Sequence, residues 1–295
     1  MDRFSGTPSL PGRGEVGVDR LTCADCGNTI RDSDSFCGQC GRALTTKVDI
    51  LDSPPPLALG LAPWRGGQVA LGVLIIAIAI IPVVLLSAVA GGLAGRYAMA
   101  ATVWASSHIM GLVILGVVWQ LGLKGFTANI RANLRGHLRS LGLNAPSTSL
   151  RRSALLTLGV LAGSLAATGV YAALVRWLDF SLLVPPDIPP DLVFPGAAAV
   201  LTFQALAVWT PITEEIFFRG FIFAGLASRL GIRGAMVGSA LVFSLFHMDP
   251  GVLVPIFITG FLLAWLYHRT GSLWPNIVAH AGQNALALVV TIFFL

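Results

Sequence analysis

Polar, glycine and proline residues fill the first sixty or so positions, and long apolar runs separated by short polar stretches follow them. About 20 apolar residues at 1.5 Å each span the hydrocarbon core of a bilayer, and several runs reach that length. The pattern predicts an all-α polytopic membrane protein of about seven transmembrane helices, of which the fourth is overlong and the fifth short. We place them near Gln68–Ala90, Tyr97–Leu121, Ala154–Val175, Ala197–Leu226, Ala235–His247, Gly251–Tyr267 and Trp274–Phe294.

Composition supports a membrane protein. Of the 295 residues 55% are hydrophobic and 11% are charged, whereas about 25% are charged in an ordinary globular protein. The net charge of +5 does not indicate nucleic acid as a partner, because the arginines lie at the ends of apolar segments, where they fit anionic lipid headgroups. With the N-terminus in the cytosol, most basic residues fall on the inside, so we expect a cytosolic N-terminus and an external C-terminus.

The polar N-terminal region contains all four cysteines, in two Cys-x-x-Cys pairs that are each followed by glycine: Cys23, Cys26, Cys37 and Cys40. Four thiolates at this spacing predict a structural Zn²⁺ in a small zinc ribbon, and a redox pair is the weaker alternative. We therefore expect a disordered segment 1–20, a cytosolic ribbon 21–43 able to bind a protein partner, a proline-rich linker 44–67 and a membrane domain 68–295. No cleavable signal peptide is expected.

Two of the three glutamates, Glu214 and Glu215, are adjacent within the fourth apolar segment. A charge at the centre of a transmembrane helix costs about 2.5–3.5 kcal/mol on insertion scales, and such residues mark reaction or transport sites. Glu215 and Arg219 are four apart, which suits an ion pair, and Glu214 points about 100° away as a free carboxylate. Pro211 is expected to break the helix just before them.

Three further polar residues, His247, His280 and Asn284, lie in otherwise apolar segments. Counted from the nearest arginine at the cytosolic end of each helix, all three and Glu214 lie 11 to 15 residues deep. At 1.5 Å per residue this places them in one layer, roughly 16–23 Å from those arginines. Any one of them alone would be read as a hydrogen bond between helices, but four polar residues at one depth indicate a site.

These residues form three motifs on successive segments, namely Glu214-Glu215-x-x-x-Arg219, Phe243-x-x-x-His247 and His280-x-x-x-Asn284. In this order they resemble the motifs of the CPBP intramembrane proteases, which include the CAAX prenyl endopeptidases. The resemblance covers residues 154–295 and implies hydrolysis of peptide bonds within the membrane. It implies that Glu214, helped by His247, activates a water molecule, that His280 and Asn284 stabilise the oxyanion, and that Glu215, Arg219 and Phe243 support them.

Alternatives remain at this point. Glutamate and two histidines could instead hold a catalytic Zn²⁺, which would make the enzyme a metalloprotease. The motifs could also hold together a non-enzymatic scaffold or immunity protein, and acids and histidines at mid-depth also build proton-coupled transporters. The expected substrate is a membrane-embedded or lipidated protein, whose identity the motifs do not give.

Overall fold

The computed structural model describes residues 64–124 and 136–294, together with residues 26, 28, 29, 39–41 and 62. Among the predicted zinc ligands, Cys26 and Cys40 belong to these residues, whereas Cys23 and Cys37 lie outside them. The predicted disordered segment 1–20 and most of the linker 44–67 also lie outside the described residues. The chain divides into two compact units, Met1–Asp49 and Ile50–Leu295, and the helices belong to the second.

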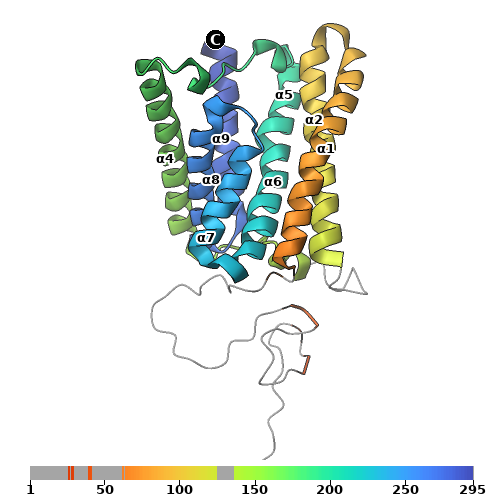
Figure 1. Ribbon diagram of the computed structural model, residues 1–295, viewed down its shortest axis with the longest axis vertical. Coiled ribbons are helices and arrows are strands. Elements are labelled where there is room, and N and C mark those ends of the chain that lie inside the picture. Colours follow the sequence, from red (N-terminus) through yellow and green to blue (C-terminus); the bar gives the residue numbers. More distant parts are fainter. Residues whose placement is uncertain are drawn as a thin grey trace, which may run out of the picture. The chain divides into compact units, whose positions relative to one another are not determined.

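The described part of this second unit is a bundle of helices without β-strands (Figure 1), as expected for a polytopic membrane protein. Six helical runs within it are long and apolar enough to cross a membrane. Helices α1 and α2 pack together at one edge of the bundle and α4 lies at the other, against α8 and α9. The main helices are α1 (Gly66–Gly92), α2 (Ala98–Val117), α4 (Leu150–Trp177), α5 (Ala199–Phe203), α6 (Thr210–Glu215), α7 (Ala224–Leu245), α8 (Pro250–Thr270) and α9 (Leu273–Phe294).

One of the six runs, Gly196–Leu245, contains both the fourth and the fifth predicted segments. Gly231 interrupts it with φ 66° and ψ 176°, a backbone conformation that glycine adopts without steric cost. The chain folds back there, as two contacts between its arms show. The Ser239 hydroxyl donates to the Phe218 carbonyl oxygen, and the Phe218 and Phe243 rings are 4.9 Å apart. The fifth segment is therefore a short returning helix, which explains its length.

The fourth segment does not break at Pro211, contrary to the expectation from sequence. The chain continues as helix through Thr210–Glu215, and no side chain caps a new start there. Wider π-helical turns, η7 (Gln204–Trp209) and η8 (Ile216–Phe223), flank this piece on both sides. Such turns accommodate a proline within a continuous helix and are frequent at functional sites.

Aromatic side chains of η8 form the centre of the core. Phe217, Phe221 and Phe223 are almost fully buried and pack against α1, α2, α7 and α9. Trp64 belongs to this core although its position falls in the predicted linker: it is 2% exposed, and its indole Nε1 donates to the Phe221 carbonyl oxygen at 2.8 Å. Helix α1 begins two residues later, so the ordered bundle starts before the predicted boundary.

Candidate functional site

The charged centre of the bundle is the pair formed by Glu215 and Arg219, whose side chains are 0% exposed. Arg219 Nη1 donates to Glu215 Oε1 at 2.8 Å, and Nη2 donates to the Gly260 carbonyl oxygen of α8 at 3.0 Å. The guanidinium carbon also lies 4.6 Å from the centroid of the Phe243 ring, a cation–π contact. The predicted pairing is present, and it links η8 to α7 and α8.

Asn276, one helical turn before His280 on α9, also contacts this pair. Its Nδ2 donates to Glu215 Oε2 at 3.2 Å and to the Leu263 carbonyl oxygen at 2.7 Å. Asn276 is not among the site residues predicted from the sequence. Its signal is the spacing of Asn276, His280 and Asn284, which follow one another at intervals of four and so share one face of an apolar helix.

His280 lies between the two glutamates. Its Nδ1 is 2.9 Å from Glu215 Oε1, and its Nε2 is 3.6 Å from Glu214 Oε2. Because Glu215 is held as a carboxylate by Arg219, it accepts a hydrogen bond, so Nδ1 carries the hydrogen and Nε2 faces Glu214. Glu215 therefore orients the imidazole, a role that goes beyond neutralising Arg219.

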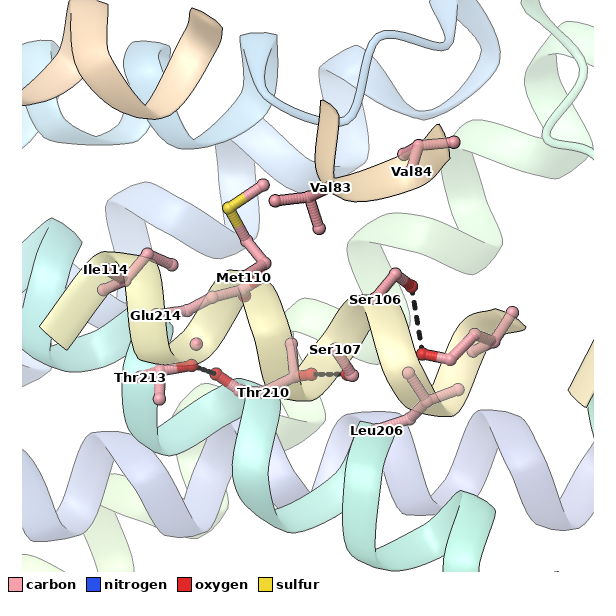
Figure 2. A pocket seen from close by; sticks show the side chains of 12 residues that line it. Val83, Val84, Ser106, Ser107, Met110, Ile114, Leu206, Thr210, Thr213 and Glu214 are labelled. Carbon is pink, nitrogen blue, oxygen red and sulfur yellow. Dashed lines mark hydrogen bonds between the residues drawn. The ribbon is translucent and has the colours of Figure 1, made fainter. Parts of the chain in front are cut away.

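Glu214 differs from its neighbour in exposure, since 22% of its side chain is accessible. It lines two cavities, one of about 260 Å³ and one of about 210 Å³, which also share Met110 and Ile114 of α2. Figure 2 shows the first cavity with Glu214 beside Thr213 on one wall and α1 residues across from it. The expectation of a free carboxylate agrees with this geometry.

His247 lines the second cavity together with Glu214. Its Nδ1 is 3.0 Å from the Phe243 carbonyl oxygen, so Nδ1 donates and Nε2 remains available to the cavity. The next residue, Met248, has φ 50°, an uncommon conformation for a side chain of this size. Asp249 then caps α8 by accepting from the Gly251 amide at 2.8 Å, so its side chain is engaged structurally.

The Phe243 ring connects the two histidines, with centroid distances of 5.1 Å to His247 and 5.7 Å to His280, both edge to face. Asn284 lies one turn beyond His280, and its Nδ2 donates to the Leu206 carbonyl oxygen at 2.8 Å. The structure thus brings His280, His247 and Phe243 to the glutamates, while Asn284 contacts the helix that precedes them.

Among the described residues, no group of three or more His, Cys, Asp or Glu side chains is arranged to hold a metal ion. Nδ1 of each histidine is engaged within the protein, in His280 by Glu215 and in His247 by the Phe243 carbonyl oxygen, whereas Glu214 and the two Nε2 atoms face the cavity without being gathered around one point. We therefore derive no step of the reaction through a bound metal.

Comparisons with known proteins match the segment that contains these residues. Residues 196–286 match the sequence model of the family described as "Type II CAAX prenyl endopeptidase Rce1-like". The match contains Glu214, Arg219, His247, His280 and Asn284, and it confirms the resemblance for this segment, whereas α1, α2 and α4 lie outside it.

A Bacillus subtilis (strain 168) protein named "Putative membrane peptidase YdiL" is 35% identical to this chain over 80 residues, which are 27% of this chain and 33% of the relative. The chain thus aligns with about a third of the length of the curated relative that it matches. No solved structure matches the chain.

The buried pair generates a prediction about stability. Arg219→Met leaves Glu215 as an uncompensated buried charge, so we expect the free energy of unfolding to fall by about 3–5 kcal/mol. Glu215→Gln together with Arg219→Met removes both charges and should recover most of that loss. Unfolding by SDS titration in mixed micelles measures both.

Glu214→Gln is the matched control, because it changes the adjacent, partly exposed carboxylate and should shift stability by less than about 1 kcal/mol. If Arg219→Met unfolded at the wild-type SDS fraction, the pair would not hold the bundle together.

Proposed function

We propose that this chain is an intramembrane endopeptidase that hydrolyses peptide bonds with a glutamate-activated water molecule. The observation that carries the proposal is the contrast between two adjacent glutamates. Glu215 is fully buried and engaged by Arg219, Asn276 and His280, whereas Glu214 is partly exposed where two cavities meet. A carboxylate that is left free beside an oriented imidazole is suited to accept and return a proton.

The first step is attack by water. The water oxygen bonds to the carbonyl carbon of the substrate while one of its protons passes to Glu214. His247 Nε2, which faces the same cavity, accepts a hydrogen bond from this water and helps to orient it. The product of the step is a tetrahedral intermediate with a negatively charged oxygen.

Breakdown of that intermediate needs an acid. Glu214 returns the proton to the nitrogen of the leaving amine as the carbon–nitrogen bond breaks, which regenerates the carboxylate. His280 Nε2, 3.6 Å from Glu214 Oε2, lies where it can share that proton, and Glu215 holds the ring in place through Nδ1. Glu215 is thus a positioning residue rather than a catalytic one.

The negative oxygen of the intermediate requires hydrogen-bond donors. We assign this role to the amide of Asn284 and to His280 Nε2, which becomes a donor when the proton taken up by Glu214 moves onto it and which gives that proton back before the amine leaves. The Asn284 amide group has two N–H bonds, and the contact with the Leu206 carbonyl oxygen uses one of them. Donors aimed at a developing oxyanion in a site shielded from water each contribute about 2.7–4 kcal/mol to the transition state.

The smaller cavity suggests the kind of substrate. Besides Glu214 and His247 its walls are apolar, with isoleucine side chains from α1 and aromatic rings from η8: Ile76, Ile80, Phe217 and Phe218. An apolar segment of a membrane-embedded or lipidated protein would bury its side chains there. The name of the matching family, which refers to prenylated CAAX proteins, is compatible with a lipidated substrate.

A metal-dependent form of the same protease and a non-enzymatic scaffold are the alternatives. Both can be separated from the proposal by kinetics and metal analysis on one set of variants.

Glu214→Gln is expected to lower turnover of an internally quenched transmembrane peptide in phospholipid vesicles by about 10³-fold, because loss of a general base costs 10²–10⁴-fold. His247→Gln should lower it by about 10²-fold on the same grounds. The control is His268→Gln, which changes a histidine on α8 that the mechanism does not use. Wild-type turnover in folded Glu214→Gln protein would rule out the protease mechanism and favour a scaffold.

Metal content gives a second test. We propose that Cys23, Cys26, Cys37 and Cys40 bind one structural Zn²⁺, so the wild-type chain should contain about one zinc ion and the Cys→Ser quadruple variant none. That variant should keep its turnover in the peptide assay. If it retained zinc and lost activity with a chelator, the catalytic site itself would be metal-dependent.

A further inference from the structure

The larger cavity beside Glu214 has a wall of hydroxyl groups. Four of its lining residues carry a hydroxyl: Ser106 and Ser107 of α2, Thr210 and Thr213 of α6. Figure 2 shows these side chains between Glu214 and the far end of the cavity, with Val83 and Val84 of α1 across from them. Ser and Thr are common where membrane helices pack together, and here four of their hydroxyls line one cavity.

Two of these four hydroxyls direct their hydrogen to the backbone of their own helix. Ser106 Oγ donates to the Val103 carbonyl oxygen at 3.0 Å, and Thr213 Oγ1 donates to the Thr210 carbonyl oxygen at 3.1 Å. Ser107 and Thr210 hydrogen-bond to each other across the two helices at 2.5 Å. Each oxygen keeps acceptor capacity, so the wall presents acceptors in sequence toward the Glu214 carboxylate.

The position of this wall is fixed by close packing of α2 on η7. Trp209 Nε1 donates to the Ser107 carbonyl oxygen at 3.1 Å, and the Trp209 ring stacks on His108. A Cβ added to Gly111 would come within 2.3 Å of Trp209 Nε1, so a glycine is needed for this approach. His108 Nε2 lies 3.1 Å from Gln204 Nε2 of η7, which adds a further contact between the two helices.

The two cavities differ in what they can hold. A water molecule is stable in a cavity when two to four polar groups can bond it, whereas a cavity lined by apolar side chains stays dry. The hydroxyl-lined cavity has four hydroxyls and the Glu214 carboxylate along one wall, and its 260 Å³ has room for several waters. In the smaller cavity the polar groups are Glu214 and His247, beside which the attacking water would lie, and the other lining side chains are isoleucine, phenylalanine and methionine.

We propose that the hydroxyl-lined cavity is the water supply of the site, separate from the cavity that takes the substrate. It follows α2 from Ile114 to Val103, roughly 16 Å, toward the end of the bundle where α1 connects to α2. Water enters there, moves along the hydroxyls and reaches Glu214, where this cavity meets the one that takes the peptide. One water is consumed in each turnover, and this route replaces it while the substrate fills the apolar cavity. The inference rests on the proposed hydrolysis, but the presence of the water can be measured without it.

The test is radiolytic hydroxyl-radical labelling of the full chain in phospholipid nanodiscs, read by mass spectrometry at individual methionines. Met110 lines both cavities and reports water where they meet, so the hydroxyl variant below assigns that water to one of them, whereas Met236 is 5% exposed in the core and serves as the dry reference. Because bound water is the source of the radicals, we expect Met110 to be oxidised about tenfold faster than Met236. Using the Glu214→Gln protein makes this result independent of whether the chain is a protease.

Ser107→Ala combined with Thr210→Val removes two hydroxyls from the wall and should bring Met110 oxidation down toward that of Met236. Met248, which lines the apolar cavity and not this one, should be oxidised as before. Met110 protected like Met236 in the parent protein, or oxidised equally with and without the hydroxyls, would overturn the proposal.

A kinetic arm uses the same double variant with Glu214 present. Turnover should fall about tenfold with KM unchanged, since positioned water is lost and the substrate cavity is intact. Thr157→Val is the matched control, because it removes a buried hydroxyl from α4, where Thr157 Oγ1 donates to its own helix at Ser153. An equal fall in both variants would assign the effect to stability and contradict the water route.

Discussion

The buried ion pair between Glu215 and Arg219 is the interaction on which the rest of the arrangement depends. Two charges at 0% exposure in an apolar bundle are tolerated because each bonds the other and further groups of the bundle, although Arg219 Nε has no hydrogen-bond partner among the described residues. Arg219 bonds the α8 backbone and stacks on Phe243 of α7, and Glu215 accepts from Asn276 and His280 of α9. One pair therefore ties η8, α7, α8 and α9 together, and breaking it leaves a buried charge without a partner.

The same pair creates the asymmetry that the proposed chemistry uses. With Glu215 neutralised and His280 oriented, Glu214 can remain a reactive carboxylate although it is the next residue in the chain. The fold-back at Gly231 brings His247 to the same cavity, and α1 and α2 enclose Glu214 from the other side. Helices outside the matched family segment thus supply much of the surroundings of the proposed base.

Local spacing was enough to predict the Glu215–Arg219 pair, because residues four apart on a helix face each other. The apolar runs predicted the helices. The number of residues between each polar side chain and the nearest flanking arginine predicted that His280 lies near Glu214. Contacts between distant segments could not be read in this way: Asn276 on Glu215, Trp64 on Phe221 and the hydroxyls of α2 depend on how helices pack. The break predicted at Pro211 is wrong, because the adjacent π-helical turn accommodates a residue without an N–H and the helix continues.

The most direct test of this account is the turnover of Glu215→Gln/Arg219→Met, the variant in which the buried charges are removed together and Glu214, His247 and His280 are intact. An amide at position 215 no longer fixes the hydrogen on His280 Nδ1, a change that costs about 10⁴-fold in serine proteases when the buried aspartate becomes asparagine. We predict that the folded variant loses turnover by about 10²-fold or more, with little change in KM. Turnover equal to that of the wild type in the folded variant would contradict the account.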